Sequence, residues 1–262
     1  MKILFHANCQ GWALEKFFKF SPDASKFETK NIQTFMLELG TTTLEEEREF
    51  LDWADIMFCM SNDGRNPRLG NPIEFIKGRQ GLTVIPMSTH FNGGYFISWA
   101  TEDCWKQIFE YAKTHTIEEA IDYAVLEADM GYKKRWEQNL FRMKEKETEE
   151  GVDESMRLSH VVESLYLKEQ QNTTMNHPTS VILYDWANML LKHLGFAPIP
   201  DSFRKECLDN MIIANLPCED WICTGAKKHL GLEYGATEYE DRRCRELVKD
   251  KLLKWESEGR PL

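Results

Sequence analysis

The sequence predicts an α/β protein, in which a parallel sheet with flanking helices is followed by a mainly helical part packed against it. Up to about residue 100, short apolar runs alternate with helical patterns, as in parallel sheets with crossover helices. From Asp103 onward, apolar residues recur only at helical spacing. We therefore expect residues 1–100 to form the sheet region and residues 101–262 the helical region, together as one compact unit.

The first predicted strand is the apolar run Ile3–Phe5, which has no polar face. Such a run is typical of a strand buried on both sides, so we place it at the centre of the sheet. Polar residues 6–11 follow, and apolar positions resume at helical spacing from Trp12. Cys9 is therefore expected in the turn where the strand ends and a helix begins.

The other elements follow from the same patterns. A loosely alternating stretch at 27–36 predicts an edge strand. Thr43 with Glu46 forms a capping box before a short acidic helix. We expect the other two strands at 55–61 and 82–87, with a helix at 71–79. Later helices are expected at 105–112, 117–128, 131–150, 153–171, 180–194 and 237–255, with a polar turn at 172–179.

Composition narrows the class of protein. The chain has 262 residues, of which 42% are hydrophobic, as in a packed globular protein. A net charge of −11 argues against nucleic-acid binding, and no stretch reaches the roughly 20 apolar residues of a membrane span. A start directly in a strand and seven cysteines without framework spacing predict a cytoplasmic protein with reduced thiols. The C-terminal cysteines lack the paired spacing of a zinc motif, so no metal is expected.

Cys9 is the first candidate functional residue. Free N–H groups and the dipole at a helix N-terminus favour anions, so a thiol there can have a lowered pKa and act as a nucleophile. The amides of Asn8 and Gln10 could donate to an oxyanion. The alternative is that Cys9 is a small buried filler, which is common for free cysteines.

A thiol nucleophile also needs a base within hydrogen-bond reach. His177 stands next to Asn176 in the predicted turn and is the first candidate. His90 is the second, because it lies in a glycine-punctuated loop after the strand at 82–87. A histidine alone is more often a core or capping residue whose hydrogen bonds are satisfied. Both assignments as a base therefore depend on Cys9 lying close to the histidine.

Anion-binding residues are expected at the carboxyl edge of the sheet, where ligands of open α/β sheets bind. Arg65 and Arg68 follow the strand at 55–61 and could receive phosphate groups. Ser88 follows the strand at 82–87 and begins another polar loop at this edge.

Three short motifs in order resemble the WcbI family of capsular polysaccharide biosynthesis proteins. They are Ala7-Asn8-Cys9-Gln10, the strand Val84-Ile85-Pro86 leading to Phe91-Asn92-Gly93-Gly94-Tyr95, and Met175-Asn176-His177-Pro178 before a helix. The resemblance covers the first hundred residues and residues 153–195. It implies binding of coenzyme A or acetyl-CoA, and acetyl transfer to a hydroxyl of a carbohydrate acceptor.

On this interpretation Cys9, His177 and His90 are catalytic, and the cofactor is bound by Asn8, Gln10, Gly11, Arg65, Arg68, Ser88 and Asn176. Cys9 would either take the acyl group covalently or line the site while His177 activates the sugar hydroxyl. Two other functions stay open: a non-catalytic module that binds coenzyme A or a nucleotide, and an acyl-ester hydrolase using the same cysteine. The sequence also leaves a homo-oligomer open.

Overall fold

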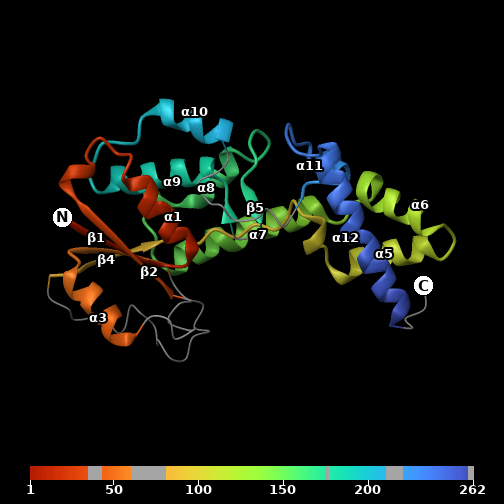
Figure 1. The fold of residues 1–262 in the computed structure, drawn as a ribbon, viewed down its shortest axis with the longest axis horizontal. Helices are drawn as coiled ribbons and strands as arrows, with labels where there is room; N and C mark the ends of the chain where they lie inside the picture. The colour runs from red at the N-terminus through yellow and green to blue at the C-terminus, as the bar shows by residue number, and fades with distance from the viewer. Residues whose placement is uncertain (35–42, 61–80, 175–176, 211–220, 259–262) are drawn as a thin grey trace. The chain divides into compact units, whose positions relative to one another are not determined.

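The computed structural model describes residues 1–34, 43–60, 81–174, 177–210 and 221–258, and it confirms the predicted α/β class. Within this part of the chain the main sheet has four parallel strands in the order β2-β1-β3-β4 (Figure 1). The strands are β1 (Lys2–Ala7), β2 (Glu28–Gln33), β3 (Ile56–Met60) and β4 (Thr83–Met87). The predicted run Ile3–Phe5 therefore lies in an interior strand, and the loosely alternating strand is at an edge.

The two faces of β1 are covered by different helices. On one face Phe5 and Phe58 stack with ring centroids 5.4 Å apart, and Phe18 of α1 (Cys9–Phe18) meets the edge of Phe5 at 5.0 Å. On the other face Leu4 belongs to a buried apolar cluster with Leu51 of α3 (Leu44–Trp53). Burial on both faces explains why β1 carries no alternating polar pattern.

Packing divides the chain into two compact units. The first comprises Met1–His90, Met143–Val161 and Pro178–Asn215, and the second comprises Phe91–Arg142, Val162–His177 and Leu216–Leu262. This division differs from a single boundary at residue 100, because later segments return to the unit that contains the sheet.

The helices after the sheet agree with most of the predicted ranges. They are α5 (Glu102–Ala112), α6 (Ile117–Asp122), α7 (Tyr132–Glu149), α8 (Leu158–Ser164), α9 (Ser180–His193), α10 (Asp201–Asn210), α11 (Thr224–Leu230) and α12 (Glu238–Ser257). The predicted capping box at Thr43 and Glu46 is confirmed. None of the helices in the described ranges combines the length and apolar character that crossing a bilayer requires.

The single helix predicted at 153–171 is wrong. Asp153 caps a short 3₁₀ turn at Glu154–Met156, α8 follows, and the chain then enters strand β5 (Asn172–Thr174). The Val162 carbonyl accepts a hydrogen bond from the Gln171 side chain, while the Tyr166 N–H bonds to the Glu163 carbonyl. Because Val162 and Tyr166 would pair in a continuous α-helix, this tertiary contact replaces the helical bond and ends α8 early.

The polar turn predicted at 172–179 also contains structure that its residues did not indicate. β5 pairs with the two-residue strand β6 (His177–Pro178) as a small separate sheet. The helix predicted at 71–79 lies outside the described residues.

Candidate functional site

The turn between β1 and α1 has the predicted form. Asn8 is the N-cap of α1, and its Oδ1 accepts a hydrogen bond of 2.8 Å from the backbone N–H of Gln10. Such a cap satisfies one of the free donors of the first turn and fixes where the helix begins. Cys9 is consequently the first residue of α1 and is half-buried.

Gly11 is required for close packing of α1 on β1. A Cβ atom built on Gly11 would lie 2.6 Å from Cβ of Ala7 and 3.4 Å from Cβ of Phe5. Glycine at this position therefore lets the helix approach its own strand, a packing role that also holds Cys9 close to the end of β1. The predicted contact between Gly11 and a ligand stays a prediction.

Gln10 joins this turn to the loop after β4. Its Nε2 donates to the His90 carbonyl at 2.8 Å, and the His90 N–H donates to its Oε1 at 3.0 Å. The amide therefore acts like a segment of backbone, pairing with both polar main-chain groups of one residue. Gln10 is 1% exposed, so the two bonds lie away from water. They fix the loop at His90 beside the start of α1.

The two amides that flank Cys9 consequently differ in what they can do. Gln10 uses its amide nitrogen to hold His90, so we assign it a positioning role, and its predicted role as an oxyanion donor stays a prediction. Asn8 uses only its Oδ1 for the cap, and no described residue accepts a hydrogen bond from its Nδ2. The Asn8 amide nitrogen is therefore the donor next to Cys9 that a ligand can use.

The expectation of a lowered pKa at Cys9 is wrong. Hydrogen bonds from the backbone N–H groups of Cys9 and Gln10 do favour the thiolate, but partial burial of the sulfur outweighs them. Burial raises the pKa of the Cys9 thiol above its ordinary value, because a low-dielectric surrounding disfavours the charged form. Cys9 alone is therefore a protonated thiol near neutral pH, and it needs a base to become a nucleophile.

Two other predicted site residues at the end of β4 are enclosed. His90 is 0% exposed, and its catalytic role stays a prediction. The Ser88 hydroxyl is also buried, donates to Glu147 Oε1 at 2.5 Å and accepts from the Leu158 N–H at 3.2 Å. The Ser88 hydroxyl therefore stabilises the interior through these two hydrogen bonds. They do not support its predicted contact with the cofactor.

Glu147 is a buried carboxylate that the sequence analysis missed. It is 1% exposed and accepts from the hydroxyls of Ser88 and Ser159 and from the Ser159 N–H at 3.0 Å. It lies in the charged run at residues 144–150, a pattern that is typical of a solvated helix face. Three donors compensate for the burial of this charge, as a buried carboxylate requires.

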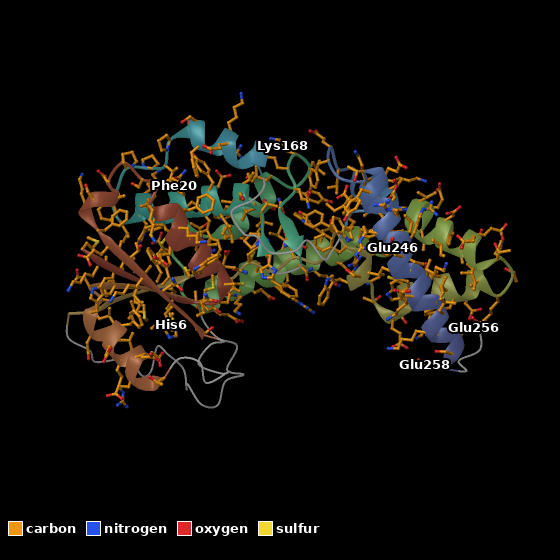
Figure 2. The ribbon with its side chains drawn as sticks, in the orientation of Figure 1. His6, Phe20, Lys168, Glu246, Glu256 and Glu258 are labelled. Atoms are coloured by element: carbon orange, nitrogen blue, oxygen red, sulfur yellow. The ribbon has the colours of Figure 1, made fainter. Side chains whose placement is uncertain are left out.

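His6 and Glu47 form a second buried polar pair. His6 Nε2 of β1 lies 2.7 Å from Glu47 Oε1 of α3, and both residues are buried. His6 is labelled in Figure 2. Among the described residues, no group pairs with the second ring nitrogen of His6, Nδ1. His6 neighbours Ile32 and Cys59 on the adjacent strands, and these belong to the apolar cluster under α3.

The structure does not test whether the remaining predicted site residues lie beside Cys9. Arg65, Arg68 and Asn176 lie outside the described residues. His177 is half-buried in β6 and belongs to the second unit, whereas Cys9 belongs to the first. That Cys9 and His177 meet in one cleft therefore stays a prediction. The described ranges contain no group of three acidic, histidine or cysteine side chains that could hold a metal.

Comparison with known proteins supports this class of fold. No family model and no curated protein sequence matches the chain. A solved structure of WcbI, described as a novel polysaccharide biosynthesis enzyme, is similar with a TM-score of 0.65 and 12% identity. The match covers 98% of this chain and 90% of that one. At this identity, the likeness shows a WcbI-like fold over the matched part of the chain and nothing beyond the fold.

Proposed function

We propose that this protein binds coenzyme A thioesters and transfers the acyl group to a hydroxyl of a carbohydrate. The observation that carries the proposal is the likeness over 98% of the chain to a polysaccharide biosynthesis enzyme. That structure is of the native protein without a disulfide bond between coenzyme A and a cysteine. Cys9 is the half-buried thiol at the strand-to-helix turn of this chain, and we assign it to the corresponding place beside the coenzyme A sulfur.

The raised pKa of Cys9 favours direct transfer over an acyl-enzyme. In direct transfer His177 takes the proton of the sugar hydroxyl, and the oxygen attacks the thioester carbonyl carbon. The new C–O bond forms while the C–S bond breaks, and the departing sulfur of coenzyme A receives the proton from the imidazolium. Cys9 then lines the thioester, and the Asn8 amide nitrogen donates to the carbonyl oxygen as its negative charge develops.

The acyl-enzyme route requires one further proton transfer. A base must first remove the proton of Cys9, after which the sulfur attacks the thioester and coenzyme A leaves as a thiol. The sugar hydroxyl then attacks the Cys9 thioester and restores the thiol. Since the free thiol is held in its protonated form, this route demands a base in direct contact with Cys9.

A non-catalytic coenzyme A binding module is the second candidate. The same raised pKa favours it, because a protonated thiol is a weak nucleophile. It predicts binding of coenzyme A and acetyl-CoA without turnover on any carbohydrate. This geometry does not favour the hydrolase alternative, since a hydrolase of this kind needs an activated Cys9.

Thermal unfolding in the presence of coenzyme A, acetyl-CoA and nucleotides tests the proposal. A ligand at 100 times its dissociation constant stabilises the native state by about 2.7 kcal/mol, so binding gives a clear rise in Tm. We expect this rise with both thioester-related ligands. No shift with either of them would refute the proposal and the binding module alike.

Variants then separate the routes. Cys9→Ser is expected to retain acetyl transfer to an acceptor sugar if transfer is direct, and to abolish it if the acyl group passes through sulfur. His177→Ala is expected to abolish transfer on either route. Cys104→Ser, which alters another half-buried free thiol, serves as the matched control. Acid quenching followed by mass spectrometry detects an acetyl group on Cys9 directly. Full activity of both the Cys9 and His177 variants would exclude these residues from the reaction.

A further inference from the structure

Two cysteines of the second unit lie in contact and have no role in the proposed reaction. Cys223 directly precedes α11, and Cys244 lies in the second turn of α12. Their side chains share a hydrogen bond, and both thiols are free. Cys223 is 0% exposed and Cys244 is 1% exposed. The two residues are separated by 21 positions, so the fold and not the local sequence brings them together.

Hydrogen bonds on both sides of this pair hold the two segments together. Asp241, three residues before Cys244 on α12, accepts from the Thr224 N–H at 2.8 Å and from the Thr224 hydroxyl at 2.7 Å. The Cys244 thiol in turn donates to the Trp221 carbonyl at 3.6 Å. These contacts flank Cys223 on both sides and therefore fix it against the face of α12 that carries Cys244.

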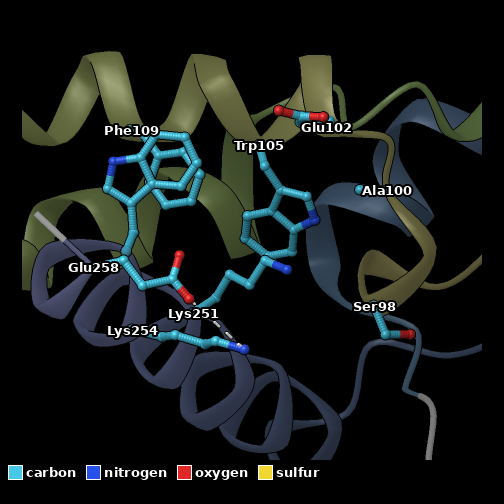
Figure 3. A pocket seen from close by; sticks show the side chains of 9 residues that line it. Ser98, Ala100, Glu102, Trp105, Phe109, Lys251, Lys254 and Glu258 are labelled. Atoms are coloured by element: carbon cyan, nitrogen blue, oxygen red, sulfur yellow. Dashed lines mark ion pairs between the residues drawn. The ribbon is translucent and has the colours of Figure 1, made fainter. Parts of the chain in front are cut away.

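Packing also fixes the other half of α12. The rings of Phe109 on α5 and Trp255 on α12 stack with centroids 3.6 Å apart (Figure 3). Val248, one turn after Cys244, is fully buried. Because α12 is held along its length, packing sets the position of Cys244 relative to Cys223.

The two thiols differ in acidity. The hydrogen bond from Cys244 lowers the pKa of the Cys223 thiol and outweighs the effect of burial. The Tyr132 hydroxyl, whose oxygen lies 3.2 Å from the Cys223 sulfur, acts in the same direction. The hydrogen bond to Cys223 and burial together raise the pKa of the Cys244 thiol. Cys223 is therefore the sulfur that becomes a thiolate first, while Cys244 keeps its proton.

We propose that Cys223 and Cys244 form a redox site, in which hydrogen peroxide converts the two thiols to a disulfide bond. The Cys223 sulfur attacks the O–O bond of the peroxide, which leaves a sulfenic acid on Cys223 and releases one water. The Cys244 sulfur then attacks the Cys223 sulfur. The S–S bond forms, the S–O bond breaks, and the departing hydroxide takes the Cys244 proton as a second water. Two electrons pass from the thiols to the peroxide, so no other reactant is needed.

Burial determines which reagents reach this pair. Trp221 and Thr224, which stand on either side of Cys223, are half-buried, so only a thin layer of residues covers the site. Hydrogen peroxide is little larger than water, whereas a thiol reductant needs a local opening of the fold to reach the buried sulfurs. The disulfide should therefore be reduced slowly in the native state and rapidly in urea. The redox site does not depend on the function proposed for Cys9.

Mass spectrometry tests the proposal. The reduced full chain is treated with hydrogen peroxide, its remaining thiols are blocked with iodoacetamide, and tryptic peptides are analysed without reduction. We expect the peptide that contains Cys244 to be linked to peptide 206–227, which contains Cys223, and dithiothreitol in urea to separate them. Oxidation of other thiols without this link would overturn the proposal.

The sequence offers matched controls for Cys223. Cys207 and Cys218 lie on the same tryptic peptide, so a link from either of them would have the same mass. Cys207→Ser and Cys218→Ser are expected to keep the link, whereas Cys223→Ser is expected to lose it. A link that persists in Cys223→Ser would refute the assignment.

Thermal unfolding of the unmodified sequence gives a second measurement that needs no variant. A disulfide across 21 positions restricts the unfolded chain, so the oxidised protein should have a Tm at least about 5 °C above that of the reduced protein. Reduction in urea followed by refolding should reverse the gain. An unchanged or lower Tm in protein that carries the link would show that the bond distorts the fold, and would refute a site preformed for it.

Discussion

Replacing Gln10 by alanine should loosen the contact between the Cys9 turn and the loop after β4. The substitution removes two hydrogen bonds, of 2.8 and 3.0 Å, to the carbonyl and N–H of His90. Both main-chain groups would then lie unpaired in a site where Gln10 is only 1% exposed. An unsatisfied buried polar group costs about 1–3 kcal/mol, so the free energy of unfolding should fall by roughly 2–4 kcal/mol after partial relaxation.

Urea unfolding followed by circular dichroism measures this loss. Gln107→Ala, which truncates an exposed glutamine of α5, is the control and should change stability by less than about 0.5 kcal/mol. Gln10→Glu retains an acceptor for the His90 N–H but sets a carboxylate oxygen against the His90 carbonyl, so it should also destabilise the fold. A loss below about 0.5 kcal/mol in Gln10→Ala would refute the positioning role that we assign to this side chain.

Three further predictions concern the same unit. Gly11→Ala should destabilise the protein by about 1–3 kcal/mol through overpacking, and Ala7→Gly in the same chain should restore part of the loss in urea unfolding. Glu147→Ala should lower the free energy of unfolding by about 3 kcal/mol or more, because it leaves buried donors unpaired. Ser88→Ala should still show a rise in Tm with coenzyme A. Loss of that rise would indicate that Ser88 contacts the ligand. Alkylation of Cys9 by iodoacetamide should have its pH midpoint above that of the urea-unfolded chain, and a lower midpoint would contradict the burial argument.

The sign of the Cys9 effect on stability follows from the same shift. Its pKa is higher in the folded chain than in the unfolded one, so the unfolded state loses the thiol proton first as pH rises. The contribution of the protonated thiol to stability is complete below the ordinary cysteine pKa. It is lost as pH rises from that value toward the higher pKa of the folded state.

The sheet could be predicted from sequence because each strand carries its own signal. Ile3–Phe5 is apolar without interruption, and that pattern alone indicates burial on both faces. The N-cap at Asn8 and the helix start at Cys9 are also local, since a polar residue followed by apolar residues at helical spacing marks a helix start. These features required no knowledge of distant contacts.

The contacts that define the site are not local. Gln10 and His90 are separated by 80 positions, and His6 and Glu47 by 41, and no pattern in one sequence reports such pairs. The predicted helix at 153–171 failed for the same reason, because the Gln171 side chain takes a carbonyl that the helix would use. Glu147 lies in a charged run that resembles a solvated face, and only its serine partners show that it is buried.

Cys9 shows how two opposing effects at one turn restrict the chemistry. The helix start supplies N–H groups that favour the thiolate, but burial of the sulfur has the larger effect on its pKa. A bound acyl chain would cover the sulfur further and raise the pKa again, unless a cation or base came with it. Covalent catalysis by Cys9 therefore depends on a base outside its own turn, for which His177 and the buried His90 are the predicted candidates. The acyl-enzyme route needs one of these histidines to reach Cys9, whereas the direct route needs His177 only at the sugar hydroxyl.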